Sequence, residues 1–181
     1  MARRSTVALS RADVSHITSE QGGDLTIFEF ETDFAGSMRC IPMAVRFKLD
    51  HCGIKLSLRQ WSRFSYDDRL LLFHCACESP EDIRRYRTAL ISLIETRARK
   101  AAKDIAVEPA PVWADTGRVA DVVRNYARAL DLEPPTLRQW AALTALQRFT
   151  LVKLTREGHD NENFVPAMRE FGVLVREETL A

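Results

Sequence analysis

The hydrophobic and polar positions of this chain follow a helical period from residue 41 onwards. Apolar residues recur three or four positions apart in successive segments, a spacing that predicts amphipathic helices. Pro42 in a first turn and Gly53 after a last turn predict a first helix over residues 41–52. Short helices are expected after Ser57 and Ser65, because serine can cap the N-terminus of a helix.

A longer helix is predicted to begin at Ser79. The serine can cap it, Pro80 suits its first position, and Glu81 and Asp82 face the positive end of the helix dipole. Its apolar face continues to about Lys103. A linker over residues 104–114 follows, because prolines in this segment stop a helix.

The second half of the chain predicts further helices. The first begins at Asp115 or Thr116, and others begin at Thr136, Thr144 and Asn163. The expected core stripe of the first of these is Val119, Val122, Val123, Tyr126 and Leu130.

The two halves resemble each other in sequence. Residues 57–72 align without gaps on residues 136–151, at an offset of 79. Six of the sixteen aligned positions are identical, namely Leu58, Arg59, Gln60, Trp61, Arg69 and Leu72 of the first segment. The alignment predicts an all-α protein made of duplicated four-helix units, 41–103 and 115–172, packed as one helical domain with a shared core. Trp61 and Trp140 are equivalent, and burial in that core is favoured over contact with a partner.

The ends of the chain carry weaker patterns. Residues 1–24 lack sustained periodicity and are interpreted as a disordered tail. Partial alternation over residues 25–32 indicates a short strand that would need a partner elsewhere, within an extended arm over residues 25–40. Residues 173–181 are expected to form a C-terminal tail.

Composition excludes several classes of protein. The 181 residues include only 7 glycines, which disfavours a fold of many tight hairpins. Lysine and arginine number 26 against 25 aspartate and glutamate residues, so no overall attraction to nucleic acid or to anionic membranes is expected. No apolar run approaches the roughly 18 residues of a membrane span, and no export signal is recognised, so a cytoplasmic location with reduced cysteines is expected.

One cluster of residue types could hold a metal. Cys40 and Cys52 lie at opposite ends of the first predicted helix, about 18 Å apart, so they cannot share an ion. The candidate ligands are therefore Cys52, His74, Cys75 and Cys77, whose thiolates would suit zinc or an iron–sulfur centre. The alternative is that the cysteines are small buried apolar groups and that the protein holds no cofactor.

The long predicted helix is rich in basic residues. They comprise Arg84, Arg85 and Arg87, followed by Arg97, Arg99, Lys100 and Lys103. A solvated surface with charge pairs one turn apart explains such a pattern. The alternative is a docking face for an acidic partner.

Three segments carry a family resemblance. They are FEFETDF at residues 28–34, RCIPMAVRFKLDHCGIKLSLRQW at 39–61 and REGHDNENFVPAMREFG at 156–172. With them the chain resembles the nitrate reductase-associated protein family over roughly residues 27–172. The resemblance implies a role in nitrate assimilation, near nitrate reductase or the synthesis of its molybdenum cofactor, and it implies no catalytic residue.

These observations lead to one expected function and one alternative. The expected function is a non-catalytic accessory protein, a maturation or interaction factor for nitrate reductase or for a molybdenum-cofactor protein. The phosphate-binding loop, the nucleophile elbow and the HExxH zinc motif are all missing from the sequence, which disfavours the commonest enzyme classes. The alternative is a metal-binding or thiol-redox protein that uses the cysteine and histidine cluster.

Overall fold

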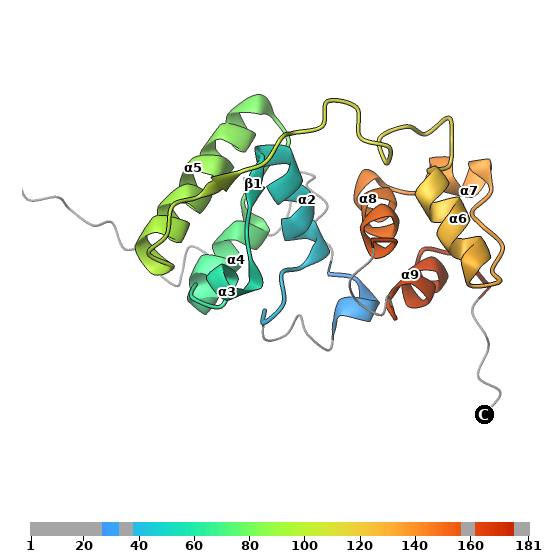
Figure 1. The fold of residues 1–181 in the computed structure, drawn as a ribbon, viewed down its shortest axis with the longest axis horizontal. Helices are drawn as coiled ribbons and strands as arrows, with labels where there is room; N and C mark the ends of the chain where they lie inside the picture. The colour runs from blue at the N-terminus through green and yellow to red at the C-terminus, as the bar shows by residue number, and fades with distance from the viewer. Residues whose placement is uncertain (1–26, 33–37, 157–161, 176–181) are drawn as a thin grey trace, which may run out of the picture.

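The computed structural model describes residues 27–32, 38–156 and 162–175, and it is mainly helical (Figure 1). This confirms the predicted all-α class. The predicted tail over residues 1–24 lies outside the described residues, as do parts of the predicted arm and of the C-terminal tail. The described elements are η2 (Glu29–Glu31), α2 (Met43–Cys52), β1 (Ile54–Lys55), α3 (Leu58–Trp61), α4 (Tyr66–His74), α5 (Pro80–Arg97), β2 (Lys103–Asp104), α6 (Asp121–Ala129), α7 (Leu137–Ala142), α8 (Ala145–Leu154) and α9 (Phe164–Glu170).

Short polar side chains set where most of these helices begin. In each capping box, the side chain of the N-cap residue accepts from the backbone three residues later, and that later side chain accepts from the N-cap backbone. Capping boxes open α3, α4, α5, α7 and α8, with Ser57, Ser65, Ser79, Thr136 and Thr144 as the N-cap residues. These starts are as the sequence predicts.

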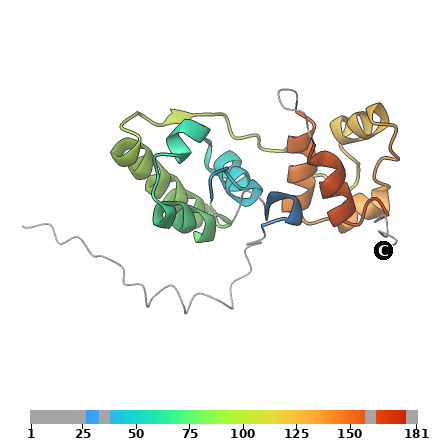
Figure 2. The ribbon, with the colours of Figure 1, turned by 90° about the horizontal axis from the view of Figure 1, so that it is seen from below.

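The helices fall into two halves along the long axis of the molecule (Figure 1). Helices α2 to α5 lie in one half and α6 to α9 in the other, while the segment after β2 crosses between them. Helices α2 and α8 meet where the halves join. Seen from below, η2 lies at the same junction (Figure 2).

The buried side chains form two clusters rather than the one shared core that was expected. The first includes Trp61 and Tyr86, and the second includes Trp140 and Phe164. Helix α8 contributes to both, because Leu146 and Phe149 pack in the first cluster while Leu151 and Leu154 pack in the second. The reason is geometric: a helix between two layers buries two opposite faces.

The two tryptophans occupy equivalent environments. Both are fully buried, as the sequence predicts. The Trp61 indole N–H donates to the Met38 carbonyl over 2.7 Å, and the Trp140 indole N–H donates to the Asp115 carbonyl over 2.8 Å. Similar local geometry supports the predicted duplication, which stays a prediction for the units as wholes, since α5 has 18 residues and α9 has 7.

The described part of the N-terminal arm differs from the predicted strand. In place of the strand predicted over residues 25–32, the described part contains the 3-10 turn η2. The Glu170 carboxylate accepts from the backbone N–H groups of Glu29 and Phe30, over 2.8 and 3.2 Å. The Phe28 ring packs against Phe171, with ring centroids 4.8 Å apart. Contacts with α9 therefore replace the strand partner that the pattern required.

Two helix boundaries also differ from the prediction. Helix α5 ends at Arg97 instead of near Lys103, because the chain turns back so that β2 pairs antiparallel with β1. Helix α6 begins at Asp121 rather than at Asp115 or Thr116. Within the stripe predicted for it, Val122 and Leu130 are exposed, while Val119 is buried ahead of the helix.

Gly53 allows the segment that contains Ile105 and Val107 to pack closely against the end of α2, and a residue with a side chain would prevent this contact. It ends α2 with φ of +67°, and a Cβ atom there would lie 2.8 Å from Val107 Cγ2 and 3.0 Å from the Ile105 carbonyl oxygen. We expect Gly53→Ala to lower the free energy of unfolding by about 2 kcal/mol, since backbone strain and overpacking add. Gly172→Ala is the control, because Gly172 has φ of +69° with nothing within 4 Å, so about 1 kcal/mol of strain remains. Urea unfolding followed by circular dichroism measures both, and equal losses would contradict the close approach.

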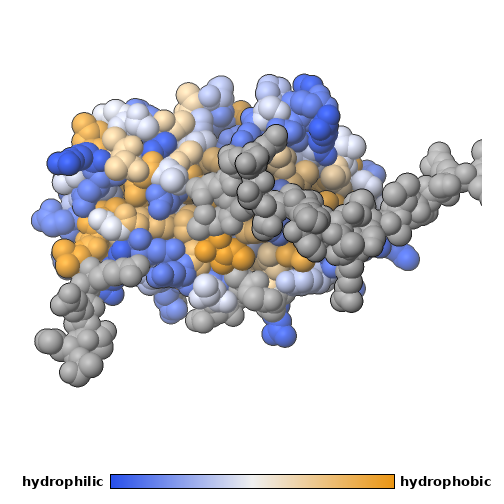
Figure 3. Space-filling view, turned by 180° about the vertical axis from the view of Figure 1, so that it is seen from behind, coloured by the Kyte–Doolittle hydropathy of each residue, from blue (hydrophilic) through white to orange (hydrophobic). Residues whose placement is uncertain are grey.

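The surface of the described residues is mixed in character. Apolar residues reach it in several places between charged ones on the face opposite to that of Figure 1 (Figure 3). Among the helices that the structure describes, none has both the length and the apolar composition needed to cross a membrane.

Candidate functional site

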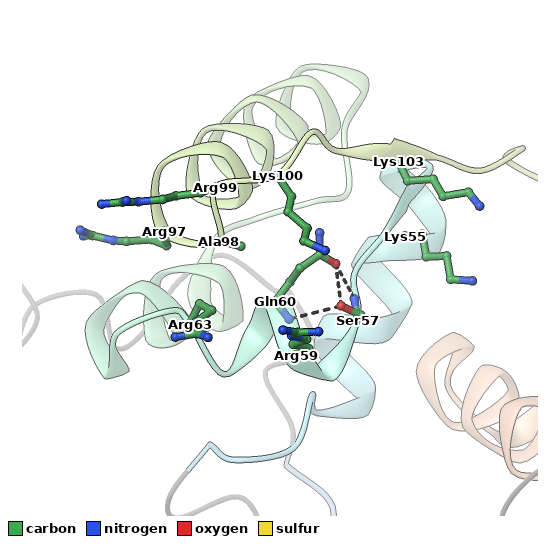
Figure 4. A pocket seen from close by; sticks show the side chains of 10 residues that line it. All are labelled: Lys55, Ser57, Arg59, Gln60, Arg63, Arg97, Ala98, Arg99, Lys100 and Lys103. Atoms are coloured by element: carbon green, nitrogen blue, oxygen red, sulfur yellow. Dashed lines mark hydrogen bonds between the residues drawn. The ribbon is translucent and has the colours of Figure 1, made fainter.

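A basic groove lies where α3, the end of α5 and the β1–β2 ladder meet (Figure 4). It encloses about 680 Å³. Ten described residues line it: Lys55, Ser57, Arg59, Gln60, Arg63, Arg97, Ala98, Arg99, Lys100 and Lys103. Seven of these are lysine or arginine and none is acidic, so the groove concentrates positive charge in a chain whose net charge is only +1.

The β1–β2 ladder places two like charges together. Lys55 and Lys103 are direct partners in the antiparallel register, and their side chains extend in the same direction (Figure 4). Like charges directly opposite each other destabilise a strand pair. An anion between the two ammonium groups would relieve that repulsion.

Helix α3 holds its basic residues through its first turn. The Gln60 side-chain oxygen accepts from the Ser57 backbone N–H over 2.9 Å and from the Ser57 hydroxyl over 2.8 Å (Figure 4). This closed capping box fixes the turn that carries Arg59 and precedes Arg63. Both guanidinium groups therefore extend from a backbone that is already ordered.

The end of α5 supplies the other wall. Arg97 donates to both oxygens of the Asp68 carboxylate, over 2.9 and 3.2 Å. Desolvation opposes ionisation of Asp68, but hydrogen bonds from Arg97 and Ser65 hold the pKa of this carboxyl below its ordinary value. Arg99 follows with φ of +51°, a left-handed conformation that non-glycine residues seldom adopt. Here the chain leaves the helix with a basic residue where glycine is usual.

The arginines singled out near the start of α5 lie in a different setting. Arg84 and Arg85 both pair with Glu81, and the Arg87 guanidinium pairs with Asp104 over 2.8 Å. None of the three lines the groove, whose basic residues come from the other end of the helix. The groove thus uses the later basic residues of the series that begins in α5, and a docking role for Arg84, Arg85 and Arg87 stays a prediction.

Three of the basic groove residues are not part of the basic series that the sequence analysis identified in the long helix. Lys55, Arg59 and Arg63 lie some 40 residues before the basic end of α5, and the β1–β2 pairing together with the packing of α2 and α4 on α5 brings them beside it. The signal available in the sequence was the repeat itself. Arg63 aligns with Ala142 and Lys55 with Pro134, so these two positive charges are specific to the first half.

The predicted metal ligands do not form a metal-binding group. Within the described residues, no three His, Cys, Asp or Glu side chains are placed to hold one ion. The Cys52 thiol lies 3.5 Å from the Leu49 carbonyl oxygen and the Cys77 thiol lies 3.8 Å from that of Lys48, so both thiols face backbone acceptors of α2. Zinc and iron–sulfur centres need thiolates, whereas a thiol donating to a carbonyl keeps its proton.

Lys48 binds the backbone of the segment that lies between Cys52 and Cys77 in the sequence. Lys48 Nζ donates to the Phe73 and Cys75 carbonyls, over 2.6 and 2.8 Å, at the end of α4. It thus satisfies carbonyls that the helix leaves unpaired. His74 is exposed at the last residue of that helix.

Burial also lowers the reactivity of three of the four thiols. Desolvation raises the pKa of Cys52 to about 11 and that of Cys77 to about 12. It also raises the pKa of Cys75, which is half-buried, while Cys40 is exposed. Because the thiolate is the reactive form, burial and protonation act in the same direction.

We therefore expect the cysteines of the native protein to differ sharply in alkylation rate. At pH 7 iodoacetamide should modify Cys40 first and Cys75 slowly, while Cys52 and Cys77 should react only in denaturant. Raising the pH to about 9 should leave the two buried thiols protected, since their pKa values lie well above it. Peptide mass spectrometry after timed quenching measures each site. Rapid native labelling of Cys77 would contradict the burial.

The chemistry of the groove is that of anion binding. Guanidinium and ammonium groups bind carboxylates and phosphates through charge-assisted hydrogen bonds. No aromatic residue lines the groove within the described part of the chain, so the stacking that single-stranded nucleic acids use is not offered there.

Comparison with known proteins gives one match. Residues 27–171 match the family described as conserved nitrate reductase-associated protein. No curated protein and no solved structure matches the chain.

Proposed function

The chain belongs to the conserved nitrate reductase-associated protein family, and from this membership we propose that it is an interaction factor whose basic groove docks an acidic segment of nitrate reductase. The observation that carries the proposal is a groove with seven basic residues and no acidic one. In this role the protein is a non-catalytic accessory factor of nitrate assimilation in the cytoplasm, and it assists maturation or assembly of the enzyme.

Charge complementarity favours a carboxylate-rich segment of a protein as the occupant. The cations are spread over β1, α3, the end of α5 and β2, so a chain lying along the groove could contact several of them. With a net charge of +1, the rest of the surface gives little attraction to anions in general. Binding should therefore depend on this groove and weaken as salt screens it.

A matched pair of substitutions tests the proposal. Arg59 and Arg138 are equivalent positions in α3 and α7, and both are exposed, but only Arg59 lines the groove. Arg59→Glu should weaken binding to purified nitrate reductase about tenfold, because an attractive pair becomes a repulsive one. Arg138→Glu makes the same change of net charge and should leave the affinity unchanged.

Biolayer interferometry with immobilised nitrate reductase measures both variants at about 50 and about 200 mM salt. The affinity of the native protein should fall across this range, and that of Arg59→Glu should fall less. Equal affinities for the two variants, or no binding of the native protein, would overturn the proposal. The same measurement is made with an immobilised molybdenum-cofactor protein. Binding to that protein and not to nitrate reductase would also overturn the proposal.

A further inference from the structure

A second cavity, distinct from the basic groove, lies between the two halves. It encloses about 560 Å³ and is formed by the end of α2, by α8 and by the segment that connects the halves. This volume falls in the range of cavities that hold small molecules. Around it Ile105, Val107 and Val112 expose apolar side chains, with exposed fractions of 37%, 53% and 50%.

Aromatic rings form part of the cavity wall. The Trp113 ring centroid lies 5.6 Å from that of His51 and 6.1 Å from that of Phe149, and all three residues line the cavity. The Phe47 ring packs against two of these rings, with its centroid 5.1 Å from those of both Trp113 and Phe149. Trp113 is only half-buried, unlike Trp61 and Trp140, so part of its ring is free to contact a ligand.

The connecting segment is held in place at both ends of the cavity. The Ile105 N–H donates to the Gly53 carbonyl over 3.0 Å, and Arg148 Nε donates to the Trp113 carbonyl over 2.8 Å. Because this wall is already ordered, little conformational entropy of the protein is lost when a ligand binds to it.

Two groups of opposite charge lie side by side in the lining. Lys153 Nζ pairs with Asp50 Oδ2 over 2.7 Å, with side-chain exposures of 16% and 36%. The pair offers a donor-only group beside an acceptor-only group. Two acids and two bases line the cavity, Asp50 and Glu108 against Lys153 and Arg156, so the lining favours no charge on a ligand.

We infer that this cavity binds a neutral planar heteroaromatic molecule, with its ring against Trp113 and its polar edge at Asp50 and Lys153. The edge that matches carries N–H donors next to a carbonyl acceptor, as guanine does: the carboxylate accepts from the ring N–H and amino groups, and the ammonium donates to the oxo group. This inference is independent of the proposed function, because it concerns a different site and an uncharged ligand.

Titration of the full chain with guanosine tests the inference, with the three indole N–H signals of the nitrogen–proton correlation spectrum as the readout. Up to about 1 mM guanosine should shift the Trp113 signal in a saturable way. The Trp61 and Trp140 signals should stay in place, since both rings are buried and bound to backbone carbonyls. Purine riboside, which lacks the polar edge, should bind at least tenfold more weakly.

Two lysine variants separate this cavity from the basic groove. Lys153→Met keeps much of the apolar stem and should weaken guanosine binding about tenfold, whereas Lys100→Met alters only the groove and should have no effect. If Lys153→Met fails to fold, Val107→Asp replaces it in this test. Val107 lies at an exposed position on the rim, and its replacement by aspartate should also weaken guanosine binding. An unmoved Trp113 signal, equal binding of purine riboside, or equal effects of the two lysine variants would each overturn the inference.

Discussion

Replacing Trp61 by alanine should lower the free energy of unfolding by about 3–5 kcal/mol, the range expected when a large buried aromatic residue is removed from a core. Trp61 is fully buried, its ring centroid lies 6.0 Å from that of Phe64, and the Arg69 guanidinium carbon lies 5.7 Å from its ring. Total stabilities of proteins are about 5–15 kcal/mol, so this loss would bring the chain close to unfolding. Urea unfolding followed by circular dichroism measures it.

Two further substitutions separate packing from hydrogen bonding. Trp61→Phe should cost less than alanine, about 1–3 kcal/mol, because most of the ring volume stays and Arg69 still donates to the Met38 carbonyl over 3.0 Å. Trp113→Ala should cost less still, since Trp113 is only half-buried. A loss below about 1 kcal/mol for Trp61→Ala would show that the first core does not depend on this ring.

Lys103→Glu should raise stability while it lowers affinity for nitrate reductase. The substitution puts a carboxylate directly opposite Lys55 in the β1–β2 ladder, replacing a repulsive pair by an attractive one. Cross-strand pairs of opposite charge contribute about 0.2–1 kcal/mol, so the free energy of unfolding should rise by up to that amount. The groove loses one positive charge and gains a negative one, and the affinity should fall about tenfold.

The double variant Lys55→Glu/Lys103→Glu is the decisive control. It restores a like-charged pair, so its stability should return to about that of the native protein, while its affinity should fall about a hundredfold. Chemical unfolding and binding to immobilised nitrate reductase are measured on the same preparations. A parallel fall of stability and affinity in Lys103→Glu would mean that Lys103 acts through the fold rather than through a bound anion.

Local chemistry made much of the helical architecture predictable. Ser65 and Asp68, or Thr144 and Gln147, satisfy backbone groups three residues apart, and no distant contact is needed to form such a box. The fully buried tryptophans follow from their place in amphipathic segments. The predicted helix starts at these capping boxes and the predicted burial of Trp61 and Trp140 were therefore confirmed.

The features that were missed depend on distant contacts. The end of α5 carries no glycine or proline after Arg97, and the helix stops there because β2 pairs with a strand some 50 residues earlier. The arm turns at Glu29–Glu31 because Glu170 holds its backbone. The groove needs the same strand pairing, so the sequence indicated its α5 residues but not Lys55.

Helix α8 contributes to the cores of both halves, so we expect the two halves to unfold as one cooperative unit. Phe149 packs in the core of the first half and Leu151 packs in the core of the second. If α8 unfolds with one half, the core of the other half therefore loses side chains that it buries. Partial unfolding of a single half would then be rare, and the amide protons of α2 and α8 should exchange with solvent only through opening of the whole molecule. A mutation that destabilises either core should therefore lower the population of molecules in which the groove and the cavity are both formed.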